Sequence, residues 1–196
     1  MERAAISLLT VCGLEELDGH RERRVTHALS ILDPGWPDPS SFESFPPHRR
    51  TILRFHDIIE DVPGQIAPTR AHVDEILAFG EGLAAEAHER DEGHLLIHCH
   101  MGISRSTAAM LMLLAQNDPT ESGEALGERL VAIRPQAWPN ARMTAFADEA
   151  LGRGGDLARA ATRLHARQLA DKPRLAQVMS DLGRAREVEA ALAFAA

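Results

Sequence analysis

The sequence predicts an α/β fold followed by a C-terminal helical extension. Short apolar runs typical of strands alternate with stretches in which apolar residues recur at helical spacing. One run, HLLIHC at 94–99, is apolar throughout its middle, as a central parallel strand should be. A glycine-rich break, GRGGD at 152–156, separates this pattern from Ala- and Arg-rich helical segments. We therefore expect one α/β domain over residues 1–151 and a helical extension over residues 152–196.

The strands and loops of the domain follow from local composition. Runs rich in branched apolar residues and bounded by turn residues indicate four strands: AISLLTV at 5–11, VTHALSI at 25–31, TILRFHD at 51–57 and HLLIHC. The polar segment between the first two strands reads as a turn, and the Pro- and Ser-rich segment 33–50 reads as a long surface loop. A second loop, IIEDVPGQIAPT, follows the third strand and carries acidic residues.

Helical periodicity fills the rest of the chain. Apolar residues recur at helical spacing from Thr69 to Arg90. Three further helices are expected over 107–116, over about 122–133 and after Asn140, which is a suitable N-cap. Beyond the glycine break, the segments DLARAATRLHARQLA, DKPRLAQVMSDLG and REVEAALAF predict two or three helices, and Asp171 with Pro173 resembles a helix start.

Composition excludes several functional classes. The chain has 196 residues and a formal net charge of -8, which disfavours a nucleic-acid partner, since such proteins carry a basic face. No apolar run is long enough to cross a membrane, and AAISLLTVCGL reads as a first strand because no A-x-A cleavage pattern follows it. The two cysteines, Cys12 and Cys99, form no disulfide framework, so we expect a reducing, cytoplasmic location.

The segment HCHMGISRS, at 98–106, carries the strongest chemical signal. A strand, a Gly-containing loop and a helix form a cradle whose amides and helix dipole bind an anion. Cys99 begins this loop and Arg105 ends it, so the groups that bind phosphate oxygens would also stabilise a thiolate. Gly102 suits a turn of positive φ, and Ser106 is placed to donate a hydrogen bond to the departing sulfur. A buried core thiol and a surface arginine would each be ordinary, but their combination in this setting favours a nucleophile.

This segment resembles the signature loop of the cysteine-dependent protein tyrosine phosphatases, and it is most similar to the dual-specificity pattern H-C-x-x-G-x-S-R-S. IRPQAWPN at 133–140 resembles the R-P-x-x-x-P-N stretch that follows the next helix in that family. The resemblance covers about residues 5–151, strongly at the loop and weakly elsewhere. It implies a central, mostly parallel twisted sheet flanked by helices.

The resemblance also implies a two-step hydrolysis with no cofactor and no metal. Cys99 would attack phosphorus, Arg105 would bind the phosphoryl oxygens, and Ser106 would assist the leaving sulfur. An Asp on an upstream loop would act as general acid and then as base. Asp57, at the end of its strand, is our first candidate, while Glu60 and Asp61 suit the spacing back from the following helix. The remaining substrate-binding positions are His100, Met101, Gly102, Ile103 and Ser104.

The substrate is less determined than the reaction. The signature loop has no lysine, only a histidine that is mostly neutral near pH 7, which favours a phosphorylated protein, phosphotyrosine before phosphoserine or phosphothreonine. A small phosphomonoester, such as a metabolite, a nucleotide or an RNA end, remains an alternative. Two other classes also stay open: a rhodanese-like sulfurtransferase and a non-catalytic phosphate-binding module. The partner of the helical tail is undetermined, and we expect the tail to pack on the domain.

Overall fold

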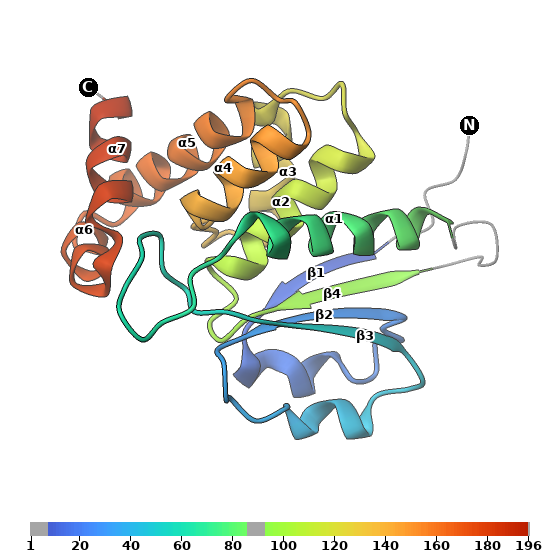
Figure 1. The fold of residues 1–196 in the computed structure, drawn as a ribbon. Coiled ribbons are helices and arrows are strands. Elements are labelled where there is room, and N and C mark those ends of the chain that lie inside the picture. The colour runs from blue at the N-terminus through green and yellow to red at the C-terminus, as the bar shows by residue number, and fades with distance from the viewer. Residues whose placement is uncertain (1–7, 86–92, 196) are drawn as a thin grey trace.

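The computed structural model describes residues 8–85 and 93–195 and contains one sheet of four parallel strands. The strand order is β1-β4-β2-β3, so β4 and β2 are central (Figure 1). The bounds are Leu8–Cys12 for β1, His27–Leu32 for β2, Arg49–Arg54 for β3 and His94–His98 for β4. The parallel α/β architecture predicted from the sequence is confirmed, with a strand at each of the four predicted places. The first residues of the AISLLTV run lie outside the described residues.

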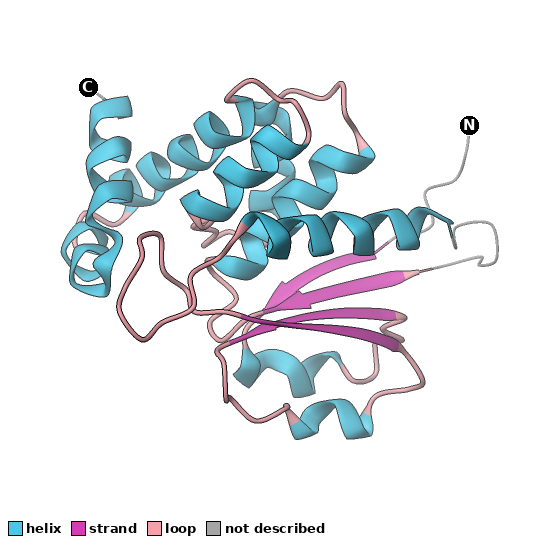
Figure 2. Cartoon of the chain, in the orientation of Figure 1, coloured by secondary structure: helices cyan, strands magenta, loops and turns pink. Residues whose placement is uncertain are grey.

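The two central strands are buried at every position because both faces of the sheet are covered. Side chains of a strand alternate between faces, and β4 shows it clearly: Leu95 and Ile97 join the larger core, whereas Leu96 joins a smaller one. The larger core lies under the α-helices. The smaller core lies under two 3-10 helices, η1 (Leu14–His20) and η2 (Ser40–Ser44), which occupy segments expected to be a turn and a loop (Figure 2).

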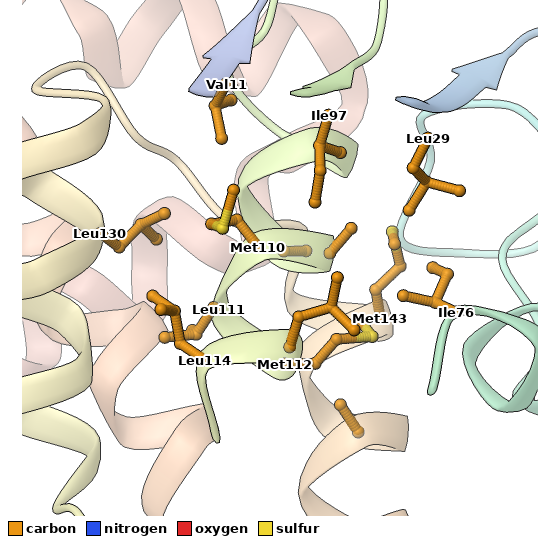
Figure 3. Packing of buried hydrophobic residues seen from close by; sticks show 14 of the residues in the cluster. Val11, Leu29, Ile76, Ile97, Met110, Leu111, Met112, Leu114, Leu130 and Met143 are labelled. Atoms are coloured by element: carbon orange, nitrogen blue, oxygen red, sulfur yellow. The ribbon is translucent and has the colours of Figure 1, made fainter. Parts of the chain in front are cut away.

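Four helices complete the domain: α1 (Arg70–Ala85), α2 (Arg105–Asn117), α3 (Gly123–Ile133) and α4 (Ala141–Ala150). The last part of the helix predicted over 69–90 lies outside the described residues. The α2 helix is buried from Arg105 to Ala115 because α1, α3 and α4 surround it. Figure 3 shows Met110 and Met112 of α2 packing among side chains from the sheet and the neighbouring helices. Asn140 caps α4 as predicted, since its side chain accepts a hydrogen bond from the Met143 amide.

The C-terminal segment forms α5 (Asp156–Asp171), α6 (Leu175–Met179), a π turn labelled η4 (Ser180–Arg184) and α7 (Ala185–Ala195). The α5 helix packs on α3 and α4, and α7 packs on α5. The expected helix start at Asp171 is wrong: Asp171 is the last residue of α5, and Pro173 lies in the turn that ends this helix. The reason is that a proline disfavours helical backbone in the residue before it and lacks the N–H that α5 would need to continue.

None of the helices in the described part of the chain is both long and apolar enough to span a lipid bilayer.

Candidate active site

The cysteine loop, residues 99–105, joins the carboxyl end of β4 to the start of α2. Its turn depends on Gly102, which has a φ of 68°. A Cβ at this position would lie 2.3 Å from the carbonyl carbon of Cys12 and 2.5 Å from the Gly13 nitrogen. The loop is therefore packed directly against the backbone at the end of β1, and the Leu14 amide donates to the His100 carbonyl oxygen at 2.9 Å.

Cys99 lies at the base of this loop with 2% of its surface exposed. Its Sγ is 3.2 Å from the Ser106 Oγ, which comes from the first turn of α2. His98 lies behind the loop: its Nε2 is 2.6 Å from the Ser30 Oγ, and its Nδ1 is 3.4 Å from the Cys99 carbonyl oxygen. Burial lowers the pKa of His98 to about 4, so this ring is neutral at pH 7 and serves as packing and hydrogen-bonding support.

Arg105 is buried at the other end of the loop. Its Nη1 donates to the Asp33 carboxylate at 2.6 Å and to the Phe55 carbonyl oxygen at 2.5 Å. Its Nε is buried and has no hydrogen-bond acceptor among the described residues. A buried donor without an acceptor is costly, so this N–H is suited to an oxygen of a bound anion.

Asp57 connects the loop after β3 to the cysteine loop. Its Oδ1 accepts hydrogen bonds from the Ser104 hydroxyl at 2.7 Å, the Asn140 amide at 3.0 Å and the Arg184 Nη1 at 2.8 Å. The other two candidate acids lie elsewhere: Asp61 is 85% exposed and pairs with Arg142, and Glu60 is exposed. Of the three acids, Asp57 is therefore the one in contact with the cysteine loop.

The charge state of Asp57 is set by opposing effects. Burial alone would raise the pKa of this carboxyl, but the guanidinium groups of Arg184 and Arg105 hold the pKa below its ordinary value. Asp57 is therefore a carboxylate at neutral pH in this arrangement.

The rim of the site is aromatic on one side. The rings of Trp36 and His100 are 4.4 Å apart, and the Asp33 amide donates to the His100 Nε2 at 3.2 Å. Trp36 is 45% exposed and Met101 is 68% exposed. Ile103 differs from its neighbours because it packs against the apolar cluster around Trp138 and Leu169, on the side of the C-terminal helices.

Three residues that sequence reasoning missed take part in the site. Asp33 follows β2 at the same sheet edge as Cys99, and that position is the signal that would have found it. Arg134 donates to the Gly102 carbonyl oxygen at 2.9 Å and to the Met101 carbonyl oxygen at 3.1 Å. This arginine lies within the IRPQAWPN stretch, quoted above for its resemblance alone. Arg184 lies 80 residues after Ser104, in the tail, and no pattern singles it out.

Within residues 8–85 and 93–195, no group of three or more His, Cys, Asp and Glu side chains is arranged to hold a metal ion.

Comparison with solved structures identifies the fold. The chain is similar to the human tyrosine phosphatase-like serine/threonine/tyrosine-interacting protein, with a TM-score of 0.57 and 16% identity over 76% of this chain and 95% of that one. It is also similar to human DUSP28 (TM-score 0.57, 16% identity, 76% and 91% covered) and to Tk-PTP in its active form (0.51, 19%, 76% and 95%). The chain has the fold of the tyrosine and dual-specificity phosphatases.

The shared phosphatase fold agrees with the resemblance seen in the signature loop. No protein-family model matches the chain, and a search of curated proteins finds no relative. One neighbour is named phosphatase-like and interacting, while another is named a phosphatase, so the fold by itself does not decide activity.

Proposed function

We propose that the protein is a cysteine-dependent phosphatase that hydrolyses phosphomonoesters. The observation that carries this proposal is the meeting of two separate parts of the chain: Cys99 and Arg105 begin and end the cysteine loop, and Asp57 contacts that loop from the segment after β3. Asp57 reaches that loop through its 2.7 Å hydrogen bond with Ser104. Such a site contains a nucleophile, a guanidinium for the phosphoryl oxygens and a carboxyl group for proton transfer.

The reaction proceeds in two steps. The first step starts with Cys99 as a thiolate and Asp57 protonated: the Cys99 sulfur forms a bond to phosphorus, the ester P–O bond breaks, and Asp57 gives its proton to the leaving oxygen. In the second step Asp57 takes a proton from water, the water oxygen bonds to phosphorus, and the S–P bond breaks. The Ser106 hydroxyl, 3.2 Å from the sulfur, stabilises the departing thiolate by donating a hydrogen bond. Each side chain returns to its starting state, and phosphate is released.

The substrate class that fits best is phosphotyrosine in a protein. Trp36 is exposed and lies beside His100 of the cysteine loop, where it offers an apolar surface on which a phenyl ring can pack. The signature loop contains no lysine that would favour a more highly charged headgroup. Phosphoserine and phosphothreonine are the next candidates.

A non-catalytic phosphate-binding module is the second candidate function. One observation favours it: the ion pair between Asp57 and Arg184, at 2.8 Å, keeps Asp57 deprotonated, and a carboxylate has no proton to give. Catalysis therefore requires Asp57 to gain a proton when the phosphate dianion of a substrate enters the loop.

Hydrolysis of p-nitrophenyl phosphate, measured with EDTA and a thiol reductant present, tests the proposal. Cys99→Ser is expected to abolish turnover. Asp57→Asn is expected to lower kcat by on the order of 10²–10⁴-fold, with a larger loss for phenyl phosphate, whose leaving group is poorer. Asp61→Asn is the matched control and should remain near the wild type.

Three outcomes would contradict the proposal. A wild-type protein that binds inorganic phosphate but hydrolyses neither ester would be a binding module. Transfer of sulfur from thiosulfate to cyanide without ester hydrolysis would indicate a sulfurtransferase. Retained turnover in Cys99→Ser would exclude the covalent route.

A further inference from the structure

The C-terminal helices place one buried arginine against the candidate active site. Arg184 is the last residue of the π turn η4, between α6 and α7, and it is 3% exposed. Gly183 before it has a φ of 75°, a backbone conformation that bends the chain here and that glycine adopts most readily. In Figure 1 the C-terminal helices lie beside the loop that follows β3.

The Arg184 guanidinium bridges two loops of the site. Its Nη1 donates to the Asp57 carboxylate at 2.8 Å and to the Asp57 carbonyl oxygen at 3.1 Å. Its Nη2 donates to the Ser104 hydroxyl at 2.9 Å. A planar guanidinium presents its donors in a fixed geometry, so this one side chain is bonded to the acid-bearing loop and to the cysteine loop at the same time.

A second buried charge fixes the orientation of Arg184. Glu187 is 2% exposed and accepts from the Arg184 Nε at 2.8 Å and Nη2 at 3.1 Å. The same carboxylate accepts from the Trp138 Nε1 at 2.6 Å and from the Ala141 amide at 2.8 Å. Because a buried charge is tolerated when it is paired and hydrogen-bonded, this arrangement holds the guanidinium in one place.

We propose that Arg184 is a positioning residue for Asp57, so that the C-terminal helices are a working part of the phosphatase site. This inference rests on the proposed phosphatase function. Arg184 holds the Asp57 carboxyl beside Ser104, and thus next to the place where the leaving oxygen must receive its proton. Without Arg184, Asp57 keeps its bonds to Ser104 and Asn140 but loses the connection that joins it to α7.

The charge of Arg184 makes its role measurable through pH. The charged or titratable groups that face Asp57 are Arg184 from η4, Arg105 from α2 and His100 from the cysteine loop. Two of them are cations that favour the carboxylate. Removing one cation makes Asp57 easier to protonate, so the basic limb of the pH–rate profile should move to higher pH. A residue with a merely structural role would not move that limb.

The central variant is Arg184→Met combined with Glu187→Gln, which avoids leaving a buried carboxylate without its cation. The side-chain amide oxygen introduced by Glu187→Gln can still accept from the Trp138 indole or the Ala141 amide. Arg184→Lys keeps the charge but lacks the planar fork that reaches both loops. The matched control is Arg167→Met, which removes an exposed arginine of α5 whose partner is Glu128 at 3.1 Å. Circular dichroism and inhibition by inorganic phosphate report whether each variant keeps its fold and its anion loop.

The double variant is expected to lower kcat with phenyl phosphate at least tenfold, and kcat with p-nitrophenyl phosphate by less. Adding Asp57→Asn to the double variant should cost less than Asp57→Asn costs in the wild-type background, because Arg184 acts through Asp57 and the two losses are not additive. Arg184→Lys should lower kcat several-fold while leaving the basic limb in place. Arg167→Met should match the wild type in rate and in pH profile.

Several results would overturn the inference. The first is a folded double variant with wild-type rates. The second is a folded double variant that loses kcat equally on both substrates and keeps the wild-type pH profile. If the double variant does not fold, wild-type kcat in Arg184→Lys would overturn it. A wild-type protein that hydrolyses neither ester contradicts the proposed function itself, whereas an active wild type with unaffected Arg184 variants contradicts this inference alone.

Discussion

Replacing Gly102 by alanine tests how tightly the cysteine loop is packed on β1. The φ of 68° at this position costs a residue with a side chain about 1–2 kcal/mol. The new Cβ would also lie 2.3 Å and 2.5 Å from backbone atoms of Cys12 and Gly13, which cannot rotate away as a side chain can. Overpacking of this kind costs about 1–3 kcal/mol, so the total loss should be roughly 2–5 kcal/mol.

The loss is measured as the free energy of unfolding in urea, followed by circular dichroism. The matched control is Gly152→Ala, because Gly152 has a φ of 63° but nothing lies within 4 Å of the added Cβ. The control should lose about 1–2 kcal/mol from the backbone conformation alone. Equal losses in the two variants would refute the reasoning, since they would mean that the loop does not press on the backbone of β1. Any folded Gly102→Ala protein should also lose phosphatase activity, because the loop must shift.

Three further predictions concern stability and reactivity. Asp148→Ala should lower the free energy of unfolding in urea by about 1–3 kcal/mol. The reason is that the Asp148 carboxylate accepts hydrogen bonds at the start of α5, from the amides of Gly155, Leu157 and Ala158. An unchanged unfolding midpoint would contradict this. Burial lowers the pKa of His98 and of His165 to about 4. As pH falls below the ordinary histidine pKa of about 6.5, these rings therefore bind protons in the unfolded chain before they do so in the folded one. Each ring should then lower the free energy of unfolding by about 2 kcal/mol near pH 5 relative to pH 7. His165→Phe should therefore weaken the fall in the free energy of unfolding between pH 7 and pH 5. An equal fall in the variant and the wild type would contradict this prediction. Burial raises the pKa of Cys12 to about 12, so Cys12 should resist iodoacetamide in the native protein, and rapid labelling seen by mass spectrometry would show otherwise.

The cysteine loop could be predicted from the sequence because its chemistry is local. Cys99, Gly102 and Arg105 lie within seven residues of one another, between a buried strand and a helix, and the structure places them accordingly. The N-cap at Asn140 is local in the same sense. The choice among Asp57, Glu60 and Asp61 was not local, because it depends on how the loop after β3 folds back onto the cysteine loop.

The sequence predicts that the tail packs on the domain, as α5 does on α3 and α4, but it does not predict the contact of the tail with the candidate site. Periodicity indicates a helix and its apolar face, but it does not specify the surface on which that face packs. The contact between Arg184 and Asp57 depends on the left-handed turn at Gly183 and on the pairing with Glu187, and both form in the folded chain. The misassigned helix start at Asp171 has a simpler cause, since a proline such as Pro173 is common both in the first turn of a helix and one or two residues beyond a helix end.

The most direct test of the central claim is to look for the cysteinyl-phosphate intermediate. The protein is mixed with excess p-nitrophenyl phosphate, denatured rapidly during turnover, and digested for peptide mapping by mass spectrometry. One added phosphoryl group is expected on the peptide that contains Cys99, and none in the Cys99→Ser variant. A protein that hydrolyses the ester without that modification on Cys99 would rule out the covalent mechanism.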